Sequence, residues 1–280
     1  MFDVMEDTRD LDAVLALKPD GEALVAAIPA GLSNAPQSLP AERGAPFGGL
    51  MAALAVKAAR ESLGVTAPLR TLNVQYLAAA RFDDVHFTAE TLRGGRSTHF
   101  AEVRAGQADR PAIVASATFG REGPGPILRP LTEVTPARPL ADIASTGLNP
   151  GFAPWFTQWV EYRFAEDFRG FGNHDEPVVR VWLRLKDGKP LDELRLCFLL
   201  DAVFPNYFMV SGLNISTTVD LRYDLFDAIP PEASPDGWAY FEFRSHDVSG
   251  GWAVEDGIAL LPDGAPIAAA RQLRKMITRG

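Results

Sequence analysis

The chain has 280 residues, of which 47% are hydrophobic and 22% charged, a composition typical of a globular protein. This length suits one large domain or two ordinary ones with a substantial core. The formal net charge of −9 argues against nucleic-acid binding, which needs a basic surface, although a local basic patch could still bind phosphates. No apolar run approaches the ~20 residues of a membrane-spanning helix, so we expect no membrane span.

Two features bear on the location of the protein. Residues 1–14 are acidic and lack a basic region followed by a long apolar stretch, so we expect no signal peptide. The single cysteine, Cys197, cannot form an internal disulfide and lies in the apolar run LRLCFLLDAVF. We therefore expect a buried, unreactive thiol and a cytoplasmic protein.

The first half of the chain predicts one helix and several strands. A strand is expected within residues 21–31. Residues 44–64 predict a helix that ends at Gly64, because apolar residues recur near a period of 3.6. These residues are Met51, Leu54, Ala55, Ala58 and Leu63. Alternating patterns then predict strands at residues 69–80, 84–95, 96–106 and 110–121.

The second half repeats this order after a segment rich in proline and glycine, residues 123–154, which predicts a linker. Residues 190–204 predict a helix, since Pro190 suits a first turn and Asp192 and Glu193 favour the positive end of the helix dipole. Strands are expected before and after this helix, at residues 155–167, 178–188, 213–226, 237–251, 252–261 and 265–278.

The two halves also share sequence. LRGGRSTHF matches SGGWAVED, and RPAIVASATFGR matches GAPIAAARQLRKM, in the same order and at similar spacing. Such internal similarity indicates a duplicated unit, and a helix followed by antiparallel strands indicates the α+β class. We predict an N-terminal unit at residues 1–122, a linker at 123–154, and a C-terminal unit at 155–280 that carries the site.

These segments resemble the hotdog fold and, in duplicated form, the TesB-like acyl-CoA thioesterase family. FGGLMAALAVKAA resembles the start of that family's first helix, while LLDAVFP, TTVDL and AAARQLR resemble its catalytic half. The resemblance covers about residues 44–276 and implies two tandem hotdog units, each a long helix wrapped by an antiparallel sheet. The chain departs from the pattern at Leu221, where the family often has His, and at Phe47, where many hotdog proteins have His; both bear on substrate choice.

The resemblance also implies a function. Members hydrolyse fatty-acyl or related CoA thioesters to free acid and CoA, without a cofactor, by a water held among Asp, Thr and Gln. Carried over position by position, these residues are Asp201, Thr218 and Gln272. The implied partner is an acyl-CoA substrate, and the implied setting is lipid metabolism.

Asp201 is notable on physical grounds as well. A carboxylate within LCFLLDAVF is costly unless it has a partner, because burial disfavours its ionised form. Such a group could take a proton from water as that water attacks a thioester carbonyl. A structural carboxylate bonded to backbone or to an arginine is the alternative.

Thr218 and Gln272 are expected on strands. We place Thr218 on the polar side of its strand, where it could orient a water molecule; a solvent-facing threonine is the alternative. Thr217 replaces it if the register differs by one residue. The polar side is formed with Asn214, Ser216, Asp220 and Arg222. Gln272 follows small residues and could accept from water and donate to a carboxylate, with a surface glutamine as the alternative.

Substrate-binding residues are expected at a helix start and a strand end. Free N–H groups of Gly48 and Gly49 could polarise a carbonyl or meet a phosphate, although close helix packing also explains them. Arg271 and Arg274 could meet CoA phosphates, with a solvated rim as the alternative. The first half has no acidic residue at the matching helix position, so we expect one site per chain.

Other chemistries find less support. The four histidines show no metal-ligand spacing, and we expect no metal. For a hotdog hydratase or dehydratase, the resemblance implies a His paired with an acid at a helix start. Neither candidate helix start, PFGG or PLDELR, contains His. A non-catalytic acyl-CoA-binding protein would keep a cavity and lose the site. We also expect a homodimer or a higher homo-oligomer.

Overall fold

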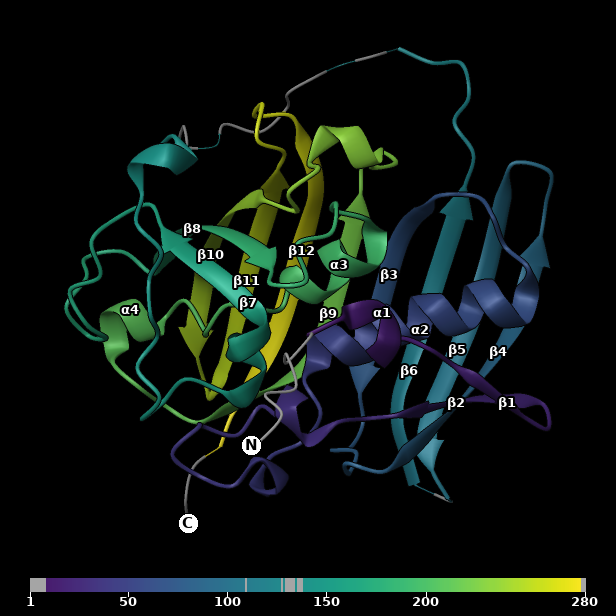
Figure 1. Ribbon diagram of the computed structural model, residues 1–280, viewed down its shortest axis with the longest axis horizontal. Helices are drawn as coiled ribbons and strands as arrows, with labels where there is room; N and C mark the ends of the chain where they lie inside the picture. Colours follow the sequence, from purple (N-terminus) through teal and green to yellow (C-terminus); the bar gives the residue numbers. More distant parts are fainter. Residues whose placement is uncertain (1–8, 109, 127, 129–133, 135–137, 278–280) are drawn as a thin grey trace, which may run out of the picture.

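The computed structural model describes residues 9–108, 110–126, 128, 134 and 138–277 (Figure 1). Its α-helices are α1 (Leu11–Val14), α2 (Gly48–Leu63), α3 (Glu193–Leu199) and α4 (Phe208–Ser211). Its strands are β1 (Lys18–Asp20), β2 (Ala23–Ala27), β3 (Leu69–Tyr76), β4 (Asp84–Gly94), β5 (Thr98–Gln107), β6 (Arg110–Gly120), β7 (Val160–Phe164), β8 (Val178–Leu185), β9 (Ser216–Leu225), β10 (Ala239–Ser249), β11 (Trp252–Leu260) and β12 (Pro266–Met276).

The described strands form a 12-stranded sheet in the order β1-β2-β4-β5-β6-β3-β9-β12-β11-β10-β8-β7. Outward from the centre, each half of the chain supplies its strands in the same relative order (Figure 1). The antiparallel pairing of β3 with β9 joins the halves, for example between Asn73 and Arg222. The predicted duplication is therefore visible as an approximate two-fold arrangement, and the α+β class is confirmed.

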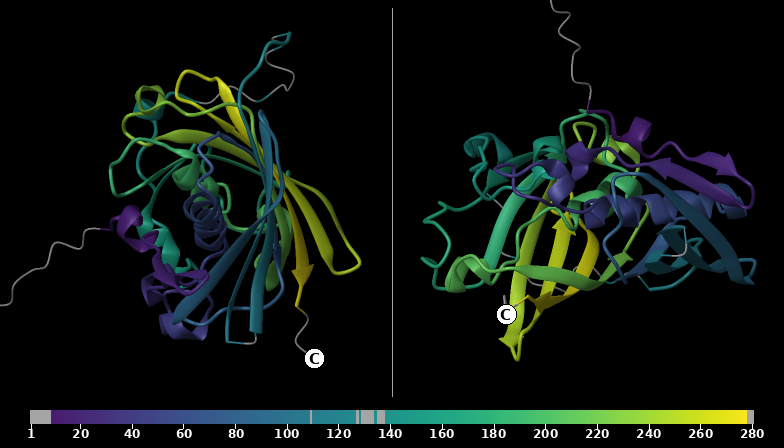
Figure 2. Two further views of the ribbon diagram at one scale, coloured as in Figure 1. Left: turned by 90° about the vertical axis from the view of Figure 1, so that its right-hand side faces the viewer. Right: turned by 90° about the horizontal axis from the view of Figure 1, so that it is seen from below.

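Helix α2 lies on the concave side of the curved sheet (Figure 2). Most of its surface is buried, and the buried residues are Gly49, Leu50, Met51, Ala52, Ala53, Leu54, Ala55, Val56, Ala58 and Ala59. The many alanines let the helix pack closely against its neighbours on several sides. The helix ends where predicted, because Gly64 adopts a left-handed φ of 63°.

Helix α3 is shorter than the sequence predicts. The predicted helix spanned residues 190–204, whereas α3 spans Glu193–Leu199. Beyond it, backbone N–H groups bond to carbonyls three residues back, as in the 3.4 Å contact from Asp201 N to Phe198 O. Pro205 also disfavours helical geometry in the residue before it. Asp201 therefore lies in a turn after α3 and not inside a helix.

The segments that flank the second unit differ in detail from expectation. The predicted strand at residues 155–167 begins as a 3-10 turn, Trp155–Trp159, before β7 starts. The predicted linker at residues 123–154 includes positions 127, 129–133 and 135–137, which lie outside the described residues, as do positions 1–8 and 278–280 of the two predicted units. The boundaries of the two units and the linker stay predictions.

A buried arginine fixes α3 to the rest of the fold. Arg195 is only 4% exposed, and its guanidinium Nη2 donates to Asp187 Oδ2 and Asp12 Oδ1, both at 2.9 Å. It also pairs with Asp192, the N-cap of α3. The Asp187 side chain is 2% exposed, so its charge depends on Arg195 for compensation. This cluster holds α3, and with it the turn that carries Asp201.

We expect Arg195→Met to lower the free energy of unfolding by about 3–5 kcal/mol, because it leaves a buried carboxylate without its partner. Adding Asp187→Asn should restore a large part of the loss, since the charge that had become unpaired is removed. Urea denaturation of the two variants and the parent measures both effects. A single variant within about 1 kcal/mol of the parent would show that the pair contributes little.

Candidate active site

The structure brings Asp201, Thr218 and Gln272 together from three elements. Asp201 lies in the turn after α3, Thr218 on β9 and Gln272 on β12. The side-chain amide of Gln272 bridges the other two: Nε2 donates to Asp201 Oδ1 at 2.9 Å and to Thr218 Oγ1 at 2.6 Å. An amide nitrogen carries two protons, so these two bonds use both.

The orientation of Thr218 depends on an irregularity in its strand. The pairing of β9 with β12 skips Val219, so that Thr218 lies opposite Arg274. Such a bulge reverses the alternation of side chains beyond it, and Thr218 turns toward Gln272. The expected placement of Thr218 on the polar face of the strand is therefore wrong. Thr217, the alternative, is exposed, and its hydroxyl is 3.5 Å from the Thr218 carbonyl oxygen.

The Asp201 carboxyl is enclosed by protein on most sides. Burial raises its pKa from 3.8 to about 6, while the Arg274 guanidinium, the Gln272 amide and the Gly49 backbone N–H each lower it by less. The carboxylate thus has hydrogen-bond donors but lacks full solvation. Its pKa lies close to neutral pH, where a general base works best.

The two glycines at the start of α2 permit this close approach. A Cβ on Gly48 would lie 2.6 Å from Asp201 Oδ2, and a Cβ on Gly49 would lie 2.6 Å from the Phe198 carbonyl oxygen. Both distances are too short for any side chain, so the glycines allow the helix start to meet the turn after α3. The Gly49 N–H donates to the Asp201 carboxylate and so helps to hold it in place.

A large cavity opens beside these residues. It has a volume of about 760 Å³, and Asp201, Thr218 and Arg274 contribute polar groups to its wall, a size within the usual range for ligand sites. Much of the remaining wall is apolar, including Met51, Ile113, Leu148, Phe152, Phe171 and Phe208. Gln272 does not line this cavity among the described residues; it lies behind Asp201 and Thr218.

The two candidate arginines on β12 lie on opposite faces of the strand. Arg271 faces away from Gln272, with a side chain 63% exposed and its Nε 2.8 Å from Asp256 Oδ1. Arg274 shares the inner face of β12 with Gln272 and is 8% exposed. Because residues three apart on a strand point in opposite directions, the two arginines lie on opposite faces of the sheet. The structure does not bring them together, and their contact with CoA phosphates stays a prediction.

Two site residues were missed by the sequence analysis. Tyr76 on β3 donates through its hydroxyl to the Gly48 carbonyl oxygen at 2.8 Å and lines the cavity. Glu255 on β11 is 3% exposed and binds Arg274. The alternation of small residues at Ala253, Gly257 and Ala259 marks this face of β11 as buried and could have revealed Glu255 as an inward acid. We find no comparable signal for Tyr76.

Within the described residues, no group of three or more His, Cys, Asp or Glu side chains is arranged to hold a metal ion. None of the helices in this part of the chain has the length and hydropathy to cross a membrane.

We expect Asp201→Asn to change the pH dependence of stability. A carboxyl with a pKa raised on folding resists ionisation, so the native protein loses stability as the pH rises from about 4 to about 6. The asparagine variant lacks this loss, and its stability relative to the parent should grow over that interval by up to about 3 kcal/mol. Urea denaturation at pH 4, 5, 6 and 7.5 measures the difference. A difference that stays constant with pH would contradict the raised pKa.

Two family models match the chain, one in each half. Residues 35–120 match the acyl-CoA thioesterase N-terminal domain, and residues 134–274 match the acyl-CoA thioesterase C-terminal domain. No curated protein matches. The second match alone covers half of the chain.

Solved structures share the fold at low sequence identity. A hotdog-fold protein of unknown function from Alicyclobacillus acidocaldarius is 24% identical, with a TM-score of 0.80 over 96% of this chain and 98% of that one. A putative thioesterase II from Thermobifida fusca is 18% identical, with a TM-score of 0.79 over 96% and 97%. An acyl-CoA thioesterase II from Mycobacterium marinum is 16% identical, with a TM-score of 0.74 over 97% and 99%. The tandem hotdog fold is confirmed, and the two family matches show that this chain belongs to the acyl-CoA thioesterase family, a family of thioester hydrolases.

Proposed function

We propose that the protein hydrolyses fatty-acyl or related CoA thioesters with a water molecule activated by Asp201. One observation carries the proposal: the Gln272 amide joins a carboxylate of raised pKa to the Thr218 hydroxyl at the wall of an apolar cavity. This arrangement supplies a base, a hydroxyl and space for an acyl chain within a few ångströms of each other.

The reaction follows from the hydrogen-bond roles of these groups. The water oxygen attacks the thioester carbonyl carbon while the ionised Asp201 carboxylate takes one of its protons. The tetrahedral intermediate then collapses, the C–S bond breaks, and the protonated Asp201 returns its proton to the departing thiolate. The enzyme ends in its starting state, with a free acid and a thiol as products.

Thr218 is suited to hold the water or the carbonyl oxygen. Its Oγ1 accepts from Gln272 at 2.6 Å and lies 3.4 Å from Arg274 Nη1. Because both of these partners donate, the hydroxyl proton of Thr218 is directed to another acceptor, and the cavity lies on its open side. Gln272 spends both amide protons on its neighbours, so its part is to orient Asp201 and Thr218.

The histidines weigh against a hydratase or dehydratase. His86 pairs with Asp20, His246 with Asp256, and His99 lies 3.0 Å from Thr91, while His174 accepts from the backbone N–H of Arg169. None of the four lines the cavity in the described part of the chain. A non-catalytic acyl-CoA-binding protein is the remaining alternative. Thiol release by the parent protein would exclude it. A cytoplasmic location and a homodimer or higher homo-oligomer stay predictions.

We expect Asp201→Asn to lower kcat for acyl-CoA hydrolysis by about 10²–10⁴-fold, the usual contribution of a general base. Thr218→Val should also lower kcat, because it removes the hydroxyl at the cavity wall. In the parent, kcat/KM should fall as the pH drops through about 6, since protonated Asp201 cannot accept a proton. Thiol release from a panel of acyl-CoAs, short to long, measures all three effects.

Asp220→Asn is the matched control, because Asp220 lies near Thr218 on β9 and bonds to Asn73 at 3.2 Å. It should retain the parental rate. An Asp201→Asn variant with the full rate would contradict the proposal that Asp201 is the general base. A parent that binds acyl-CoA without releasing any thiol would favour the non-catalytic alternative.

A further inference from the structure

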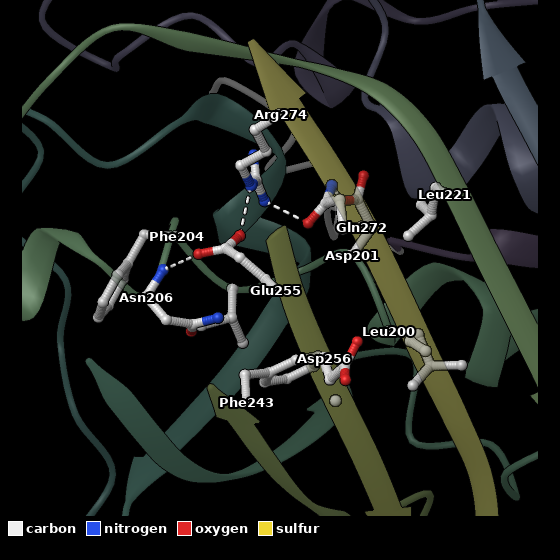
Figure 3. A pocket seen from close by; sticks show the side chains of 13 residues that line it. Leu200, Asp201, Phe204, Asn206, Leu221, Phe243, Glu255, Asp256, Gln272 and Arg274 are labelled. Atoms are coloured by element: carbon white, nitrogen blue, oxygen red, sulfur yellow. Dashed lines mark hydrogen bonds and ion pairs between the residues drawn. The ribbon is translucent and has the colours of Figure 1, made fainter. Parts of the chain in front are cut away.

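A buried ion pair lies directly behind Gln272. Arg274 Nε donates to Glu255 Oε2 at 2.5 Å, and Arg274 Nη2 donates to Gln272 Oε1 at 2.6 Å (Figure 3). The Arg274 side chain is 10% exposed and that of Glu255 is 3% exposed. Arg274 therefore connects a buried carboxylate to the amide that holds the proposed base.

This connection decides which way the Gln272 amide points. The guanidinium can only donate hydrogen bonds, so the atom of Gln272 that faces Arg274 must be the oxygen. The amide nitrogen then faces Asp201 and Thr218, both of which can accept. If the amide were reversed, its NH₂ group would meet the donors of Arg274, and its oxygen would meet the Asp201 carboxylate.

Glu255 is itself fixed by donors from two other segments. Its Oε1 accepts from the Asn206 backbone N–H at 2.5 Å and from the Ser245 hydroxyl at 2.8 Å. Both oxygens of this carboxylate are thus occupied, one by these two donors and the other by Arg274. The small cavity that adjoins the pair measures about 10 Å³, space for about one water molecule. Arg274 also lines the larger cavity, and its bonds to Glu255 and Gln272 hold it in place there.

Stability alone does not explain such a pair. Replacement of a buried ion pair by apolar side chains of similar volume is often neutral or stabilising. The guanidinium presents three donor positions in one plane: Nε to Glu255, Nη2 to Gln272 and, at 3.4 Å, Nη1 to Thr218. A lysine carries the same charge but lacks this fixed planar geometry.

We propose that Arg274, held by Glu255, is a positioning residue that fixes the Gln272 amide so that its two protons reach Asp201 and Thr218. This role rests on the proposed function and differs from the expected binding of CoA phosphates by Arg274. Asp201 and Thr218 would touch the reacting atoms. Gln272 would orient these two side chains, and the ion pair would orient Gln272.

The ion pair also acts on the charge of Asp201. Arg274 on β12 lowers the pKa of Asp201, and Glu255 on β11 raises it. Tyr76 on β3, Tyr223 on β9 and Cys197 on α3 have pKa values raised by burial, so they stay neutral. Asp256 on β11 lines the small cavity together with Asp201 and pairs with Arg271 on the other side. Removal of the two charges one at a time should therefore move the acidic limb of kcat/KM in opposite directions.

Three variants test the proposal through pH profiles of thiol release from acyl-CoA. Arg274→Met should lower kcat by roughly 10- to 100-fold, as expected when a catalytic group shifts by about 1 Å, with KM little changed and the acidic limb at higher pH. Glu255→Gln should lower kcat while its acidic limb moves to lower pH. Arg274→Lys keeps the charge, so its acidic limb should stay near the parental position while kcat remains low.

Arg180 and Glu242 provide matched controls. They form an Arg–Glu pair between β8 and β10, with Arg180 Nε 2.8 Å from Glu242 Oε2 and side chains 14% and 13% exposed. Arg180→Met and Glu242→Gln should leave both kcat and the acidic limb unchanged. If Arg274→Met does not yield folded protein, Arg274→Lys and Glu255→Gln decide the question.

Parental kcat in Arg274→Lys and Glu255→Gln would overturn the positioning role, and so would acidic limbs that move in the same direction for Arg274→Met and Glu255→Gln. A raised KM with unchanged kcat in Arg274→Met would assign Arg274 to substrate binding instead. These outcomes are distinct from failure of the proposed function, which an active Asp201→Asn variant would reveal.

Discussion

The enclosure of the Asp201 carboxyl is the constraint on which the rest of the site depends. Burial alone would neutralise this group, yet the Gly49 N–H, the Gln272 amide and the nearby guanidinium hold its pKa at about 6 and not higher. The first of these groups comes from α2 and the other two from β12, and they surround a carboxyl carried by the turn after α3. The donors that favour the ionised form of Asp201 therefore meet it only when both halves of the chain are folded against each other, because a carboxylate with fewer donors is harder to ionise.

The duplicated halves have divided their roles. The first half contributes a long, largely buried helix whose glycine start meets the turn after α3 at distances that exclude a Cβ. The second half has a helix of seven residues, and the shortened helix leaves room for the turn that carries Asp201. The pairing of β3 with β9 keeps the halves in register, so that Tyr76 from one half and Thr218 from the other line the same cavity.

The sequence predicted the strands and the first helix well, because alternation of side chains and the stop at Gly64 are local signals. It also selected Asp201 and Gln272 as candidates through their surroundings and a family resemblance, and the structure places their side chains within hydrogen-bond distance; their catalytic roles stay predictions. The face of Thr218 could not be predicted, since the bulge at Val219 arises from pairing with a distant strand. The length of α3 was overestimated because its apolar residues continue past the helix. Arg271 was grouped with Arg274 because both lie near a strand end, although strand alternation separates them.

The most direct test of the central claim is a crystal structure of the Asp201→Asn variant with an intact acyl-CoA bound. We expect the acyl chain in the apolar cavity and a water about 3–3.5 Å from the thioester carbonyl carbon. That water should lie within roughly 2.6–3.2 Å of the side chains at positions 201 and 218. A thioester bound away from these two positions, or an acyl chain outside the cavity, would contradict the claim that Asp201 activates the attacking water.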